Sequence, residues 1–167
     1  MFGLHSLVCY TLNGDNMEII DIKSDNLYLE EYCNLCSLEW GDNKSDIEMK
    51  SYIQRKKERI LTGDKVISIL GLVDDNVLIG FISLFNYDGD ERKDLTPWYA
   101  TMYVKKEYRG KGLSKILNDA IINEAKRLGY DKVYLKSELV NYYEKFGAIY
   151  IEDLKSGEKL YYIDCIV

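Results

Sequence analysis

The sequence predicts an α/β (α+β) fold, with a mixed, largely antiparallel central sheet of about six to seven strands flanked by about four helices. Apolar residues follow strand periodicity in some segments and helix periodicity in others. The order is strand, two helices, three strands, long helix, strand, short helix and two strands, which alternates less strictly than a doubly wound sheet. The chain has a single proline and no Pro- or Ser-rich linker, which indicates one continuous unit.

The first clear strand pattern covers residues 17–22, and residues 17–167 are predicted to form one domain. Residues 1–16 form either an N-terminal extension or an extra strand, and Met17 would also serve as an alternative translation start. We leave these possibilities open, because the pattern before residue 17 is short.

Two helices and a hairpin follow this strand. Residues 26–40 have apolar side chains near one helical face, and a more polar helix is expected over residues 45–61. Residues 66–73 and 77–84 are rich in strand-forming side chains. The sequence Asp-Asp-Asn at 74–76 joins them and favours a tight turn.

The second half of the chain begins with an acidic loop at residues 88–94 and a strand at residues 98–104. The strongest helical pattern starts near Arg109 and continues to Leu128, where Gly129 ends it. The remaining elements are shorter: a strand at 132–135, a helix at 138–146, and the strands of a terminal hairpin at 148–152 and 159–163.

The composition is that of a globular protein, with 47% hydrophobic and 30% charged residues. No apolar run approaches the roughly 20 residues that cross a bilayer, and no signal peptide is evident. The net charge of −6 argues against nucleic acid as a partner. It favours a cationic acceptor, although solubility alone would explain it. We therefore expect a cytoplasmic protein without a membrane partner, and a homodimer through the N-terminal extension stays open.

Four cysteines and one histidine limit the chemistry. Cys33 and Cys36 lie in the first predicted helix. No second cysteine pair and no nearby histidine complete a zinc site, so we expect small buried side chains and no bound metal. His5 is the only histidine. Ser-His-Asp and Cys-His nucleophiles would depend on it, which excludes most hydrolase mechanisms.

A strand, a tight turn with two glycines and a long helix meet at residues 102–113. Gly110 and Gly112 permit backbone conformations that other residues avoid and let an anion approach closely. The first turn of a helix offers unpaired N–H groups and a positive dipole end, which together bind phosphate groups. Basic residues crowd this turn in an otherwise acidic protein: Lys105, Lys106, Arg109, Lys111 and Lys115. The spacing fits neither a Walker loop nor a Rossmann fingerprint, and a plain, tightly packed turn is the alternative.

Two motifs at matching spacing resemble those of the GNAT acetyltransferases. The family signature is Gln or Arg, two residues, Gly, one residue, then Gly or Ala. The corresponding run here is Glu107-Tyr108-Arg109-Gly110-Lys111-Gly112, with Glu107 where Gln or Arg is usual. Downstream, Tyr143-Glu144-Lys145-Phe146-Gly147 matches the family's tyrosine, two residues, an aliphatic or aromatic residue, and glycine. The resemblance extends over residues 17–163 and implies a GNAT-like fold and an acetyl-CoA-dependent N-acetyltransferase.

The resemblance also implies the mechanism and the site. A primary amine would attack the thioester directly, which agrees with the missing histidines. The backbone of Met102, Tyr103 and Val104 would pair with the pantetheine arm of coenzyme A. The remaining residues expected to bind coenzyme A are Arg109, Gly110, Lys111, Gly112, Leu113 and Ser114, through backbone N–H groups on the pyrophosphate, and Asn141.

Tyr143 is the candidate general acid, because a hydroxyl with an ordinary pKa of about 10 can protonate a departing thiolate of pKa about 8.5. Its neighbour Tyr142 would point about 100° away on a helix. Ordinary packing is the alternative, since the chain has 15 tyrosines. We assign no general base. The carboxylates of loop 88–94 either form a solvated loop or attract a cationic acceptor.

The acceptor stays open among small amines, polyamines, aminoglycosides and peptide amines. The acidic loop favours a small cationic amine. Acetyl is the usual acyl group of the family. The alternative function is a non-catalytic CoA-binding sensor or interaction module. A third interpretation is a phosphate-binding interaction domain that does not use coenzyme A.

Overall fold

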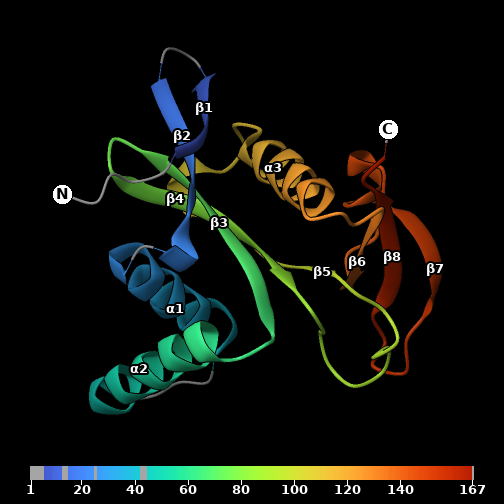
Figure 1. The fold of residues 1–167 in the computed structure, drawn as a ribbon, viewed down its shortest axis with the longest axis horizontal. Coiled ribbons are helices and arrows are strands. Elements are labelled where there is room, and N and C mark those ends of the chain that lie inside the picture. The colour runs from blue at the N-terminus through green and yellow to red at the C-terminus, as the bar shows by residue number, and fades with distance from the viewer. Residues whose placement is uncertain (1–5, 13–14, 25, 42–44, 167) are drawn as a thin grey trace.

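The computed structural model describes residues 6–12, 15–24, 26–41 and 45–166 (Figure 1). Its strands are β1 (Ser6–Leu12), β2 (Asp15–Asp21), β3 (Val66–Asp74), β4 (Val77–Phe85), β5 (Trp98–Val104), β6 (Lys132–Ser137), β7 (Ile149–Asp153) and β8 (Lys159–Asp164). Its helices are α1 (Asn26–Trp40), α2 (Asp46–Thr62) and α3 (Leu113–Arg127), with short 3₁₀ turns η1 (Ile22–Ser24), η2 (Lys106–Tyr108) and η3 (Glu144–Phe146).

The strands form one eight-stranded sheet in the order β1-β2-β3-β4-β5-β6-β8-β7. Every neighbouring pair is antiparallel except β5 and β6, which run parallel. The predicted mixed, largely antiparallel sheet is confirmed. The described residues hold three α-helices in place of about four, and the eighth strand is β1, which pairs with β2.

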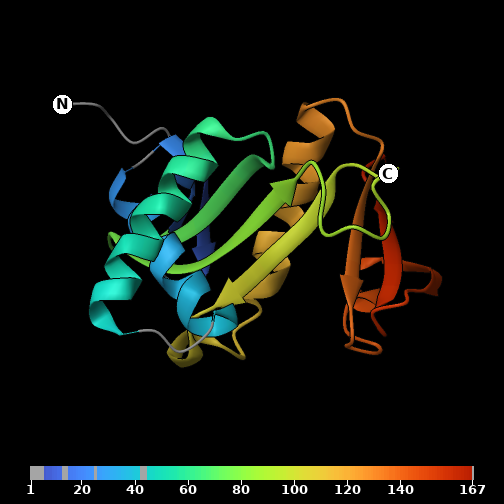
Figure 2. The same ribbon diagram turned by 90° about the horizontal axis from the view of Figure 1, so that it is seen from below.

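Helices cover both faces of this sheet. Figure 2 shows α3 on one face, and α1 with α2 on the other. Successive strand residues alternate between the two layers, so Leu70 and Ile82 join the core under α3, whereas Ile69 and Phe81 pack toward α1. Burial on both faces explains why β3 and β4 are almost uninterrupted apolar runs.

Local sequence sets the ends of several elements. Ser45 caps α2: its side chain accepts from the N–H of Glu48, whose carboxylate accepts from the N–H of Ser45 in return. Asp75 and Asn76 both have positive φ, 46° and 63°, which suits the two-residue turn between β3 and β4. These features confirm the second helix and the first hairpin.

Cys33 and Cys36 are free and buried on α1, as expected of small core side chains. Within the described ranges, no helix is long and apolar enough to cross a bilayer. His5 lies outside the described residues.

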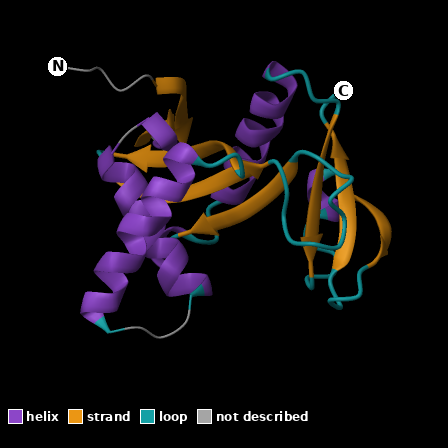
Figure 3. Cartoon of the chain, turned by 60° about the horizontal axis from the view of Figure 1, so that its bottom comes forward, coloured by secondary structure: helices purple, strands orange, loops and turns teal. Residues whose placement is uncertain are grey.

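The parallel strands β5 and β6 separate almost as soon as they meet. Trp98 opposite Tyr134 is their one paired position. Figure 3 shows the two strands diverging toward the C-terminal end of β5. The side of β5 that faces away from β4 is therefore left without a partner strand beyond this point, and residues of β5 and β6 line a cleft there.

Two helix predictions need correction. The helix expected from Arg109 begins at Leu113, because Gly110 and Gly112 both have φ of 77°, which a right-handed helix does not contain. The helix expected over residues 138–146 is absent apart from the 3₁₀ turn η3. Asn141 has a φ of 59°, which interrupts any helix there.

Candidate functional site

Two clefts meet at the middle of β5. The strand cleft has a volume of about 620 Å³ and lies between β5, β6 and the segment after β6, including Tyr143. The helix cleft has a volume of about 530 Å³ and lies between α1, α2, the start of β3 and the end of β4. Four residues line both clefts: Trp40, Phe85, Asp88 and Thr101. A molecule in one cleft can therefore contact a molecule in the other.

A bulge in β5 forms the boundary between the two clefts. The register shifts by one residue between the pairs Phe81–Tyr103 and Ser83–Ala100. Thr101 lies in this bulge with a φ of 52°, a conformation that β-branched residues rarely adopt. Such bulges commonly redirect backbone groups beside active sites.

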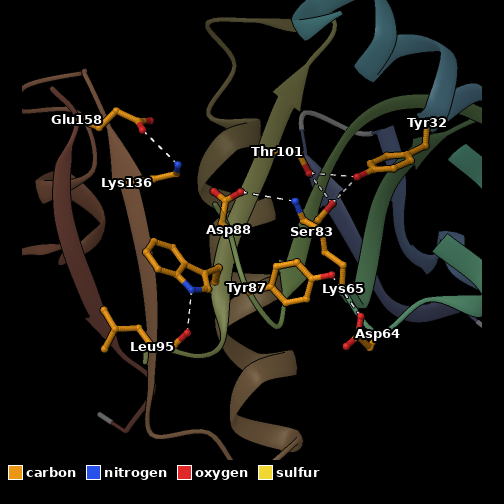
Figure 4. A network of polar contacts seen from close by, with 11 residues as sticks. Tyr32, Asp64, Lys65, Ser83, Tyr87, Asp88, Leu95, Thr101, Lys136 and Glu158 are labelled. Atoms are coloured by element: carbon orange, nitrogen blue, oxygen red, sulfur yellow. Dashed lines mark hydrogen bonds and ion pairs between the residues drawn. The ribbon is translucent and has the colours of Figure 1, made fainter. Parts of the chain in front are cut away.

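Three buried or half-buried hydroxyls hold the bulge, as Figure 4 shows. The Thr101 hydroxyl donates to Oγ of Ser83 at 2.5 Å. The Tyr32 hydroxyl lies 2.9 Å from the Ser83 Oγ and 3.4 Å from the Thr101 Oγ1. Burial raises the pKa of Tyr32 far above its ordinary value, so this hydroxyl stays neutral. This network was not predicted from the sequence, where its one visible signal is Ser83 within the apolar run of β4.

The three strand residues predicted to bind coenzyme A have different environments. Met102 lines the strand cleft. The ring of Tyr103 stacks on Phe81, with centroids 5.1 Å apart, on the side of α1. The carbonyl oxygen of Val104 accepts a hydrogen bond from Nε of Arg109 at 2.7 Å. Those backbone groups of residues 102–104 that point away from β4 have no partner strand, and of these the Val104 carbonyl is already engaged by Arg109.

The glycine turn presents unused backbone donors. Within the described chain, the N–H groups of Gly110, Lys111 and Gly112 make no backbone hydrogen bond. Those of Leu113 and Ser114 belong to the first turn of α3, where N–H groups have no partner within the helix. The N–H of Arg109, which was also predicted to bind the pyrophosphate, donates to the Lys106 carbonyl at 3.2 Å in this structure.

Space is left in front of these donors. A Cβ added at Gly110 or Gly112 would meet no atom within 4 Å. Glycine is required here by the backbone conformation and not by crowding. The positive φ of Gly110 and Gly112 and the open space beside them form a concave site, the cradle, that an anion can enter.

The basic residues around the turn divide into two groups. Lys105 and Lys115 are paired, with Glu31 at 2.7 Å and with Asp119 at 2.5 Å. Lys106 and Lys111 are exposed beside the glycines, and their ammonium groups have no ion-pair partner among the described residues. Their charge adds to the positive end of the α3 dipole.

Tyr143 lies in the strand cleft and is packed among aromatic rings. Its ring meets that of Tyr99 edge to face, with centroids 5.9 Å apart. Burial raises the pKa of Tyr143 to about 12, so the hydroxyl keeps its proton at neutral pH. Tyr142 packs against Tyr143 but does not line either cleft, and Lys145 covers its ring at 3.8 Å. Asn141 is exposed and lines neither cleft.

Only one carboxylate of the acidic loop faces the clefts. Asp88 lines both of them and lies 3.8 Å from Nζ of Lys65 (Figure 4). The other loop carboxylates are engaged in the loop itself: Asp90 with Lys93, Asp94 with Arg92, and Glu91 with the N–H groups of Lys155 and Ser156. The loop carboxylates other than Asp88 are therefore used in contacts within the loop or with the β7–β8 hairpin, and they are not free to attract a cation.

The described part of the chain contains no cluster of side chains that could bind a metal ion. No three His, Cys, Asp or Glu side chains there come close enough together to hold a metal ion. Burial raises the pKa of the Cys33 and Cys36 thiols to about 11 in each case. These thiols are therefore poor nucleophiles at neutral pH.

Comparisons with known proteins agree with this fold. The model of the acetyltransferase (GNAT) family matches residues 29–148. An aminoglycoside 6′-acetyltransferase type Ii has 18% identity and a TM-score of 0.66, covering 89% of this chain and 97% of its own. An aminoglycoside 6′-N-acetyltransferase complexed with coenzyme A has 16% identity and a TM-score of 0.65, with 89% and 97% covered. A PaiA N-acetyltransferase from Thermoplasma acidophilum in complex with coenzyme A has 22% identity and a TM-score of 0.57, with 89% and 98% covered. The comparison with curated proteins gave no match.

Proposed function

The chain belongs to the acetyltransferase (GNAT) family, and from this premise we propose that it transfers the acetyl group of acetyl-CoA to a primary amine. The observation that carries the proposal is the meeting of two clefts at the bulge of β5. One cleft would hold the acyl donor and the other the amine, so that the reacting atoms meet beside Thr101. This arrangement suits a direct transfer, in which both substrates are bound together.

The donor would bind along the strand cleft and the glycine turn. Its pyrophosphate suits the open N–H groups of residues 110–114, with Lys106 and Lys111 beside them. Its pantetheine arm, which carries amide groups, can pair with the unpaired side of β5 at Met102–Val104. Relatives of the same fold at 22% and 16% identity are complexes with coenzyme A, which supports coenzyme A as the ligand of this site.

In this mechanism the amine nitrogen attacks the thioester carbonyl, the C–N bond forms and the C–S bond breaks. A backbone N–H of β5 would stabilise the negative charge on the carbonyl oxygen. Tyr143 would give its proton to the departing sulfur, since the hydroxyl is protonated and lines the strand cleft. Asp88 lines both clefts and would receive the proton that the amine loses, directly or through water.

Initial rates measured while both substrates are varied test this proposal. Transfer within a ternary complex predicts intersecting double-reciprocal lines, whereas a covalent enzyme intermediate gives the parallel lines of ping-pong kinetics. Parallel lines would contradict the direct attack. Acetyl-CoA binding without turnover toward any primary amine would instead favour a non-catalytic CoA-binding module.

A further inference from the structure

The helix cleft is not acidic, although the chain as a whole is. Three cations line it, Lys56, Arg59 and Lys65, against the two carboxylates Asp64 and Asp88. The protein carries a net charge of −6. The reversal of sign is therefore local to this cleft and is not explained by overall composition.

Part of this charge is neutralised within the cleft and part is not. Lys65 lies 3.8 Å from Asp88, and the Tyr87 hydroxyl donates to the Asp64 carboxylate at 3.3 Å. Lys56 and Arg59 have no ion-pair partner among the described residues, although their neighbour Lys57 is paired with Glu30. One turn of α2 thus presents two unneutralised cations to the cleft.

Aromatic rings form the walls between these cations and β5. Nζ of Lys56 lies 5.9 Å from the ring centre of Tyr32 and 6.0 Å from that of Tyr52. Nζ of Lys65 lies 4.9 Å from the ring centre of Phe85. Such walls suit an apolar or aromatic body with a few charged groups at its ends.

We propose, on the basis of the acetyl transfer proposed above, that the acceptor is a small amine that also carries a carboxylate. Its amine lies toward Asp88 and Thr101, where the two clefts meet, and its carboxylate lies toward Lys56 and Arg59. An apolar side chain on the carbon that joins the two groups packs on the aromatic walls. A polyamine or an aminoglycoside would instead bring several positive charges against these cations. The cleft charge therefore does not support the cationic acceptor expected from the sequence.

Matched acceptors test this assignment. L-Phenylalanine, its amide and phenylethylamine share a ring and an amine but differ in the carboxylate, and spermidine represents the polycations. Calorimetric titration of each into the complex with coenzyme A measures binding without turnover, and thiol release from acetyl-CoA measures kcat/KM. We expect the amino acid to bind at least about tenfold more tightly than its amide, which corresponds to one charge-assisted contact.

Variants of α2 identify the residues responsible. Lys56→Gln combined with Arg59→Gln should bring the ratio of the dissociation constants of the amide and the amino acid close to one. Arg55→Gln is the control, because Arg55 lies on the same helix, donates to Ser51 and lines neither cleft. Peptides that begin with phenylalanine and carry an acidic side chain are titrated in the same way. Binding of these peptides as tight as that of L-phenylalanine would indicate a peptide acceptor, and weaker binding a free amino acid.

The outcomes separate this inference from the proposed function. Acetylation of spermidine with the highest kcat/KM, undiminished in the double variant, would overturn the inference and leave acetyl transfer standing. A wild-type preference for the acid that survives in the double variant would overturn the roles of Lys56 and Arg59. No acetyl-CoA binding in the folded protein would overturn both proposals.

Discussion

Gly112→Asp is expected to weaken acetyl-CoA binding by more than about 100-fold. Gly112 has φ of 77°, and a Cβ there would meet no atom within 4 Å, so the new side chain enters the cradle without a clash. Its carboxylate would then lie beside the pyrophosphate of the donor. Two unit charges about 5 Å apart, at an effective dielectric constant of about 20, repel each other by about 3 kcal/mol. The strain of a side chain at positive φ lowers stability in the free and bound states alike, so it does not enter the affinity.

Isothermal titration with acetyl-CoA measures this loss. Gly112→Asn adds a side chain of nearly the same shape without the charge, so the ratio of the two dissociation constants isolates the electrostatic part. Gly157→Asp is a matched control, because Gly157 also has positive φ (92°) and open space around its Cβ position, but lies in the β7–β8 turn. A folded Gly112→Asp protein that binds acetyl-CoA as tightly as Gly112→Asn would refute the pyrophosphate site.

Further predictions concern the acid, the buried tyrosines and the thiols. Tyr143→Phe should lower kcat by about 100-fold or more and leave the affinity for acetyl-CoA nearly unchanged. Tyr142→Phe serves as control, and a wild-type kcat for Tyr143→Phe would remove the acid role. Burial raises the pKa of Tyr143 to about 12, so above about pH 10 the unfolded chain loses a proton that the folded chain keeps. The melting temperature should therefore fall between about pH 10 and 12, and less steeply in Tyr143→Phe; equal slopes would contradict this. Ser83→Ala should lower the free energy of unfolding by about 1–3 kcal/mol in urea titrations, because the buried Tyr32 hydroxyl loses its 2.9 Å partner. An unchanged value would count against the network. Cys36, whose pKa burial raises to about 11, should react slowly with iodoacetamide at neutral pH, and rapid alkylation of folded protein would contradict its burial.

Much of the fold could be predicted because local patterns decide it. Residues 26–40 and 98–104 were predicted with the bounds that α1 and β5 have in the structure. Residues 26–40 have apolar side chains near one helical face, and residues 98–104 form an apolar run that Pro97 precedes and Lys105 follows. The helix predicted at residues 138–146 is wrong, because only the 3₁₀ turn η3 forms there. Leu139 and Val140 are 52% and 62% exposed and bury no such face, so no packing supports a helix there.

The candidate site was predictable where it is continuous in sequence. The glycine turn and the tyrosine motif each lie within a few residues, so their spacing could be recognised. The helix cleft combines residues from α1, α2, β3, β4, the acidic loop and β5, and no single segment indicates it. The choice of Asp88 among the loop carboxylates likewise depends on which side chains the loop uses for its own contacts.

The positive φ of Thr101 is the feature least accessible from sequence. A β-branched residue does not suggest a left-handed conformation. The conformation is held by the hydroxyls of Ser83 and Tyr32, which come from β4 and α1. The bulge depends on the packing of α1, β4 and β5 against one another, and the sequence of no single one of these elements predicts it.

The central claim is that acetyl passes from acetyl-CoA to a primary amine across the bulge of β5. Its most direct test is to quantify free coenzyme A thiol and N-acetylated amine in the same reaction, with and without the acceptor. We predict equal amounts of the two products with the acceptor present, and neither product without it. Thiol released without acetylated amine, or acetyl-CoA bound with no release in the presence of any primary amine, would contradict the account.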